Sequence, residues 1–166
     1  MKSLINGMNF MLEYVEKPLI SKEHTLEFPY LLVCIGSGDS IILVKSSTES
    51  QRIGGSIIGG GTLLGLGNLL ISENKFENLL KMAETGDNTN VDTMMREVMS
   101  PKKNEYQPHV ISSSFGKTCT EYSLNISEEY KKEDISSSLV NMIAVNIGHI
   151  STLYANIYKA TKYTII

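Results

Sequence analysis

The sequence predicts an α/β fold, and three observations support this class. Three short apolar runs, at 30–35, 40–44 and 52–58, are separated by turn residues and have the length of strands. A later run, 134–160, carries apolar residues at three- and four-residue steps, which is typical of a long helix. The last four residues, 163–166, are again apolar and indicate a buried strand.

The composition is that of an ordinary globular protein. The chain has 166 residues, 42% of them apolar and 20% charged, which predicts one domain with a sizeable core. Its net charge of -3 gives no general attraction to nucleic acid or to anionic membranes, so neither is expected as a partner. It contains no apolar run of about 18 residues and no signal-peptide pattern. We therefore expect a cytoplasmic protein with reduced thiols.

The three early strands form a predicted antiparallel meander. The run 30–35 is continuously apolar, as expected of a strand buried on both faces, and the turn residues 36–39 end it. The strands at 40–44 and 52–58 follow with a second polar turn between them. The residues before Tyr30 are mixed in character and predict a connector rather than a continuous element.

Glycine is concentrated immediately after the third strand. Seven of the 13 glycines lie between Gly54 and Gly67, and Gly59–Thr62 is interpreted as a glycine loop leading into a buried helix. Further helices are predicted at 76–85, with Gly86 as its C-cap, and at 91–99. A surface loop is then expected at 100–109, and a short strand or extended piece at 110–111.

The long helix predicted at 134–160 carries the clearest periodicity in the chain. Its stripe consists of Ile135, Leu139, Met142, Ile143, Ile147, Ile150, Leu153, Tyr154 and Ile157. A three-stranded meander, then helices, then a strand after a long helix is the order of a ribonuclease-H-like lobe. Two such lobes facing each other form the actin-like ATPase and sugar-kinase architecture. Because the chain stops within the strand at 163–166, we expect a fragment of a longer protein.

Two glycine motifs are candidate anion-binding sites. In the first, Gly36-Ser37-Gly38, glycine N–H groups and a serine hydroxyl can donate to an anion, although a plain hairpin turn explains the same residues. In the second, Gly59-Gly60-Gly61-Thr62 precedes a helix, where N–H groups and the helix dipole favour phosphate. The alternative is that these glycines permit close packing of helix on strand. Arg52 is suited to a carboxylate or phosphate, but surface arginines without such a role are common.

Other reactive residue types give no site. His24, His109 and His149 are far apart, without a metal-like partner at close spacing, and no metal site is expected. Cys34 lies in a predicted buried strand, where an inert core thiol is expected.

Five blocks of the sequence resemble the eukaryotic-type (type II) pantothenate kinases. The strand–turn–strand LLVCIGSGDSI at 31–41 is similar to the family's LLVNIGSGVSI, and 52–66 is similar to its R-x-x-G-x-x-x-GGGT-x-x-GL pattern. The segment 86–92, GDNTNVD, is similar to GD-x-TNVD, SSFG at 113–116 to ASSFG, and 146–148 to NNIG. The blocks occur in the family's order and cover about residues 30–166.

The resemblance implies a reaction and a site. Mg-ATP would phosphorylate the 4′-hydroxyl of pantothenate, the first step of coenzyme A synthesis, and acetyl-CoA or another CoA thioester would inhibit. Ser37, Ser40 and Arg52 match residues that bind pantothenate and the thioester. Gly36 and Gly38 would lie near the ATP phosphates, together with Gly59, Gly60, Gly61 and Thr62. Such kinases are homodimers, and the helix at 134–160 is a candidate for the interface, with core packing as the alternative.

The sequence also departs from the family pattern. No Asp-Ile-Gly-Gly-Thr type phosphate loop occurs, and the upstream carboxylates Glu13, Glu16, Glu23 and Glu27 lie in no matching motif, so no catalytic base is assigned. Residues 1–29 would connect to the missing lobe, and residues 30–166 would form the ribonuclease-H-like lobe, truncated at its C-terminus. Asp39 replaces the usual valine and brings a negative charge towards the expected phosphates, unless its side chain points away.

We therefore expect a fragment of a pantothenate kinase that binds ligand weakly and does not turn over alone. The alternative is a non-catalytic CoA-thioester sensor or pseudo-kinase subunit, which would keep Ser37, Ser40 and Arg52 without the base. Another sugar or acid kinase of the same superfamily is disfavoured, because those families do not share this set of three residues.

Overall fold

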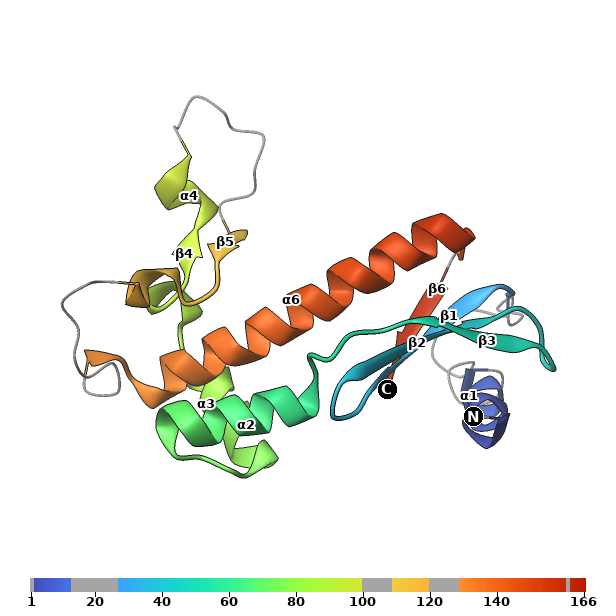
Figure 1. Cartoon of the computed structure of the whole chain (residues 1–166), viewed down its shortest axis with the longest axis horizontal. Coiled ribbons are helices and arrows are strands. Elements are labelled where there is room, and N and C mark those ends of the chain that lie inside the picture. The colour runs from blue at the N-terminus through green and yellow to red at the C-terminus, as the bar shows by residue number, and fades with distance from the viewer. Residues whose placement is uncertain (1, 13–26, 100–108, 120–128, 161) are drawn as a thin grey trace. The chain divides into compact units, whose positions relative to one another are not determined.

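The computed structural model describes residues 2–12, 27–99, 109–119, 129–160 and 162–166. The chain divides into two compact units, and each is described by itself. The first unit comprises residues 1–59 with 147–166, and the second comprises 60–146. Figure 1 labels the elements of both. No helix in the described residues is long and apolar enough to cross a membrane.

A four-stranded mixed sheet forms the first unit. Strands β1 (Tyr30–Ile35), β2 (Asp39–Val44) and β3 (Ser50–Gly54) make the predicted antiparallel meander. Strand β6 (Lys162–Ile165) lies parallel to β1, so the order across the sheet is β3-β2-β1-β6. The predicted strands at 30–35, 40–44 and 163–166 are confirmed, and with the helices they confirm the α/β class. The assignment to a ribonuclease-H-like lobe stays a prediction.

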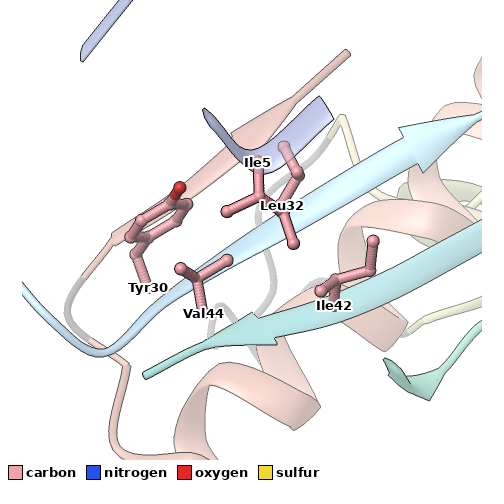
Figure 2. Close-up of a cluster of buried hydrophobic side chains, with 5 residues drawn as sticks. All are labelled: Ile5, Tyr30, Leu32, Ile42 and Val44. Atoms are coloured by element: carbon pink, nitrogen blue, oxygen red, sulfur yellow. The ribbon is translucent and has the colours of Figure 1, made fainter. Parts of the chain in front are cut away.

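One face of this sheet is covered by helix α1 (Lys2–Phe10), an element that the sequence did not predict. Ile5 of α1 packs on apolar side chains of β1 and β2, as Figure 2 shows. The cluster consists of Ile5, Tyr30, Leu32, Ile42 and Val44. The Tyr30 hydroxyl donates a hydrogen bond of 2.6 Å to Asn9 Oδ1, which satisfies its polar end at the edge of the cluster.

The opposite face of the sheet is apolar in its central strands, apart from Asp39 at the start of β2. Alternation along β1 and β2 places Leu31, Val33, Ile41 and Leu43 there, and all are buried. The long helix α6 (Lys132–Tyr158) confirms the prediction at 134–160, and the ring of its Tyr154 lies against Gly54 at the end of β3. The sheet is thus buried on both faces, as the continuous apolar run of β1 predicts.

The third strand is shorter than predicted. It ends at Gly54 rather than at residue 58, and its pairing with β2 shifts register between Ile41 and Ile42. Gly55 follows with a φ of +143°, a backbone conformation that a side chain would strain. The chain therefore leaves the sheet four residues early.

The second unit is mainly helical. It contains α2 (Gly60–Ile71), α3 (Phe76–Thr85), the 3-10 turn η2 (Asn88–Asn90), β4 (Thr93–Met94), α4 (Met95–Val98), β5 (Ile111–Ser113), the 3-10 turn η3 (Gly116–Thr118) and the first part of α6. Strands β4 and β5 pair in a separate antiparallel sheet. The predicted helix at 76–85 is confirmed, with Gly86 as its C-cap.

Two predictions for this unit were wrong. The helix predicted at 91–99 is confined to Met95–Val98, because Asp92 is drawn into a hydrogen-bonded turn and β4 pairs with β5. Helix α2 is not buried all round: Leu63, Gly67 and Ile71 form its buried stripe, whereas Leu69 is 80% exposed. The predicted loop at 100–109 lies almost entirely outside the described residues.

Candidate functional site

Ser40 and Arg52 meet on the sheet of the first unit. Arg52 is the cross-strand partner of Ile42, and Ser40 lies two residues before Ile42, so all three side chains share one face. Arg52 Nε donates a hydrogen bond of 2.9 Å to Ser40 Oγ. Arg52 is exposed, so its charge remains accessible to an anionic ligand. The predicted twelve-residue spacing thus corresponds to a direct contact between two of the three expected ligand-binding side chains.

Ser37 lies in the turn beside this pair. The turn between β1 and β2 is closed by a hydrogen bond of 2.8 Å from Gly36 N–H to the Gly38 carbonyl, and Ser37 is exposed within it. The Ser40–Arg52 pair lies on the face that α1 covers farther along the strands, since Ser40 alternates with Ile42 and Val44. One face of the sheet is therefore apolar beneath α1 and polar near the β1–β2 turn.

Cys34 lies on the same face of the sheet, at the end near the β1–β2 turn. It is the cross-strand partner of Ser40 and packs at the edge of the α1 cluster. Partial burial raises the pKa of the Cys34 thiol, which keeps the sulfur protonated and supports the expectation of an inert thiol.

Gly38 and Gly59 are placed in close backbone contacts. A Cβ on Gly38 would lie 2.6 Å from the Ser56 carbonyl oxygen, and a Cβ on Gly59 would lie 2.7 Å from the Gly38 carbonyl group. Neither position has room for a side chain, so close backbone packing alone explains why glycine occurs at both. Binding of ATP phosphates by Gly36, Gly38 and Gly59 stays a prediction.

Asp39, the residue that departs from the family pattern, holds the segment after β3 in place. Its Oδ1 accepts a hydrogen bond of 2.8 Å from Ser56 N–H and a second from the Ser56 hydroxyl. Its own N–H donates to the Ser56 carbonyl at 3.1 Å. The carboxylate therefore points at the glycine segment and not away from it. The sequence marked this residue as unusual but gave no sign of its partner.

The remaining members of the predicted phosphate set belong to the second unit. Gly60 is the first residue of α2, and Gly61 and Thr62 follow in its first turn, so the predicted helix start is confirmed. Their role towards phosphate stays a prediction.

A second polar cluster, which the sequence did not reveal, lies within the second unit around Asp92. This fully buried carboxylate accepts hydrogen bonds from Asn88 Nδ2 at 2.7 Å, from Phe115 N–H at 2.9 Å and from the Ser138 hydroxyl. Two blocks of family resemblance, 86–92 and 113–116, are thereby joined to α6 at one side chain. Phe115 has a φ of 58°, the left-handed conformation, in the SSFG block.

Asp134, in the first turn of α6, makes an equivalent connection. Its carboxylate accepts from Asp87 N–H at 2.8 Å and from Asn90 Nδ2 at 2.9 Å. An acidic side chain in the first helical turn is also favoured by the helix dipole. The GDNTNVD segment is therefore fastened to α6 at two points, which indicates a structural role for this block.

The other candidate residues are dispersed. His109 and His149 are exposed, and His24 lies outside the described residues, as do Glu13, Glu16 and Glu23. Within the part of the chain that the structure describes, no three His, Cys, Asp or Glu side chains lie close enough together to hold a metal ion.

The fold is that of an α/β protein with an exposed arginine hydrogen-bonded to a serine on one face of its sheet, and the comparisons with known proteins identify the family. The chain belongs to the Fumble family, whose model matches residues 1–164. The resemblance to eukaryotic pantothenate kinases is confirmed by relatives across most of the chain.

Three relatives illustrate the match. The chain is 38% identical over 168 residues to pantothenate kinase 2 of Arabidopsis thaliana, covering 93% of the chain and 18% of that protein. It is 34% identical over 171 residues to pantothenate kinase of Schizosaccharomyces pombe, covering 93% of the chain and 42% of that protein. It is 38% identical over 172 residues to 4′-phosphopantetheine phosphatase of Mus musculus, covering 95% of the chain and 20% of that protein. The chain thus spans less than half the length of each of these relatives.

Proposed function

We propose that this chain supplies the pantothenate-binding part of a pantothenate kinase. The observation that carries the proposal is the hydrogen bond between Arg52 and Ser40, which places a cation beside a hydroxyl next to the Ser37 turn. Pantothenate bears a carboxylate, hydroxyls and an amide, and this set of side chains suits each of them. The arginine would bind the anionic end, and the two serines would hydrogen-bond the polar groups.

The proposed reaction is transfer of the γ-phosphoryl group of ATP to the 4′-hydroxyl of pantothenate. Catalysis of this kind depends mainly on positioning and on stabilising the phosphate charge. The glycine segments at Gly36, Gly38 and Gly59 are proposed to lie near the phosphates, as part of a ribonuclease-H-like kinase lobe. Mg²⁺ would enter with the nucleotide, and the base that takes the hydroxyl proton is not assigned to any residue of this chain.

The activities for which the relatives are named support a common ligand rather than a common reaction. Two are kinases of pantothenate, and one is a phosphatase of 4′-phosphopantetheine. Both compounds contain the same pantothenoyl group. We therefore propose that the Ser37, Ser40 and Arg52 site recognises this group. In acetyl-CoA the carboxylate is replaced by an amide, whose carbonyl oxygen would accept from Arg52 instead. A non-catalytic CoA-thioester sensor is the second candidate. It is favoured because Ser37, Ser40 and Arg52 explain ligand recognition, whereas no residue of this chain is assigned as the catalytic base.

The test is to assay two proteins side by side for phosphopantothenate formation and for acetyl-CoA binding. One protein is this chain alone, and the other is the complete gene product that contains it. We expect turnover only from the complete protein, and its loss in Arg52→Ala. Acetyl-CoA binding without turnover by either protein would favour the sensor, and the absence of both activities would refute the proposal.

The proposed assembly is a homodimer through α6. Leu153 and Ile157 belong to the predicted apolar stripe of this helix, and they are 62% and 69% exposed. Four residues apart, they lie on one face of the helix, and such exposed apolar faces are typical of interfaces. Light scattering should show a dimer that Leu153→Glu with Ile157→Glu dissociates, whereas Lys132→Glu at the other end of α6 leaves it intact. A monomer at high concentration would contradict the dimer.

A further inference from the structure

We infer that Asp39 acts as an internal anion, occupying hydrogen-bond donors of the glycine segment that would otherwise bind a nucleotide phosphate. The inference deepens the proposed function and depends on it only for the identity of the anion. It concerns the segment 54–59, between β3 and α2, and its contact with the β1–β2 turn within the first unit.

The donors in this segment already bind an oxyanion. Ser56 offers its N–H and its hydroxyl, and both donate to Oδ1 of Asp39. The Ser56 hydroxyl is oriented further by Ile58, whose N–H donates to Ser56 Oγ at 3.1 Å. A backbone N–H paired with a serine hydroxyl in a glycine-rich turn is also the donor set that phosphate takes. The carboxylate therefore shows what chemistry these donors accept.

The environment of Asp39 indicates a releasable contact with Ser56, called the Asp39 latch below, rather than a purely stabilising one. Asp39 is only 5% exposed, and its Oδ2 has no hydrogen-bond partner among the described residues. A buried carboxylate oxygen without a donor is costly. No ion pair to Asp39 is found in the described part of the chain. The unsatisfied Oδ2 makes this carboxylate a poor choice for a purely stabilising contact, whereas its Oδ1 occupies the Ser56 donors as a phosphate oxygen would.

The backbone contacts keep the latch closed. The Ser56 carbonyl accepts from Asp39 N–H, and it lies so close to Gly38 that not even a methyl group fits there. Gly59 abuts Gly38 equally closely. A phosphate is larger than a methyl group, so it cannot enter between the two glycine segments while Asp39 holds Ser56. Release of the carboxylate is the step that would make these donors available.

The experiment measures binding of inorganic phosphate and of ATP to the wild-type chain, Asp39→Val and Asp39→Asn. Asp39→Val removes the acceptor together with the charge, and an apolar side chain suits a buried position. Asp39→Asn removes the charge but keeps an oxygen that accepts from Ser56. If the donors are blocked by occupancy, Asp39→Val should bind both anions at least about tenfold more tightly, because two hydrogen bonds become available to them. Asp39→Asn should stay within about threefold of the wild type.

The amide resonance of Ser56 reports the location of binding. It should shift on phosphate titration in Asp39→Val and stay in place in the wild type. Equal gains in Asp39→Val and Asp39→Asn would indicate charge repulsion and overturn the inference, as would no gain in a folded Asp39→Val. A shift of the Ser56 amide in the wild type would also overturn it. If circular dichroism shows that Asp39→Val does not fold, Asp39→Ala removes the same acceptor without added bulk.

Failure of this inference is separable from failure of the proposed function. Acetyl-CoA binding and its loss in Arg52→Ala report on the pantothenoyl site, and in the described residues Arg52 hydrogen-bonds Ser40 rather than Asp39 or Ser56. If the chain does not bind acetyl-CoA but Asp39→Val gains phosphate binding, the inference about Asp39 stands and the proposed pantothenoyl site is refuted. If the chain binds acetyl-CoA through Arg52 but Asp39→Val gains no phosphate binding, the proposed site stands and the inference about Asp39 is refuted.

Discussion

Arg52 Nε donates to Ser40 Oγ over 2.9 Å, joining the middle of β3 to the start of β2. The geometry orients the guanidinium without burying it, since Arg52 is exposed. Orientation by one hydroxyl lowers the entropy that a flexible side chain loses when it binds a ligand. The guanidinium is therefore preorganised for the anionic ligand proposed above.

The first prediction concerns this pair. Arg52→Ala should weaken acetyl-CoA binding by more than about tenfold, and Arg52→Lys should restore it only in part, because an ammonium lacks the planar fork of donors. Calorimetric titration measures the effect. Lys45→Ala is the matched control, since Lys45 is an exposed cation of the same sheet region that pairs only with Glu49 in the described chain. Equal losses in Arg52→Ala and Lys45→Ala would mean that the site attracts anions only by general charge.

The second prediction concerns the buried Asp92 of the second unit. Asp92→Asn should lower the free energy of unfolding by about 2–4 kcal/mol, because an amide replaces one acceptor oxygen with a donor inside a fully satisfied cluster. Urea unfolding measures the change. Asp87→Asn is the control in the same turn: Asp87 is exposed and caps Thr89 N–H, a role that asparagine fills within about 0.5 kcal/mol. Similar losses in the two variants would contradict a special role for Asp92.

Much of the fold could be predicted from the sequence because its signals are local. The continuous apolar run at β1 and the glycine turn after it predicted the meander. The apolar stripe from Ile135 to Ile147 predicted α6. Helix α1 was missed because Ile5 and Met8 become apolar anchors only against Leu32 and Ile42, which are distant in sequence. Short amphipathic helices depend on such tertiary packing.

The site was predictable only to the extent that its partners lie in one motif. The family pattern places Ser40 and Arg52 at a fixed spacing, and the hairpin converts that spacing into contact. By contrast, Asp39 with Ser56 and Asp92 with Ser138 join separate segments through the tertiary fold. Propensity and periodicity carry no information about which buried carboxylate meets which donor, so neither cluster was predicted.

The third prediction concerns alkaline pH. Burial raises the pKa of Tyr30 to about 12, above the value of about 10 expected when the chain is unfolded. The unfolded state therefore loses its proton first, so this contribution to stability is fully present below pH 10 and is lost as the pH rises towards 12. The wild-type free energy of unfolding should fall more steeply over this window than that of Tyr30→Phe, by at most about 1.4 kcal/mol per pH unit. Identical slopes in wild type and Tyr30→Phe would contradict the prediction.

The fourth prediction concerns Gly86, where the resemblance block GDNTNVD begins. A Cβ at this position would collide with the carbonyl group of Glu133 at the start of α6, and a backbone group cannot swing aside as a side chain can. Gly86→Ala should therefore lower the free energy of unfolding by about 2–4 kcal/mol through local strain. Gly65→Ala is the matched control: Gly65 lies within α2 with open space around it, and alanine there should add about 0.5–1 kcal/mol through helix propensity. Chemical denaturation of both variants checks the pair, and a neutral Gly86→Ala would show that the GDNTNVD turn does not pack on α6 as described.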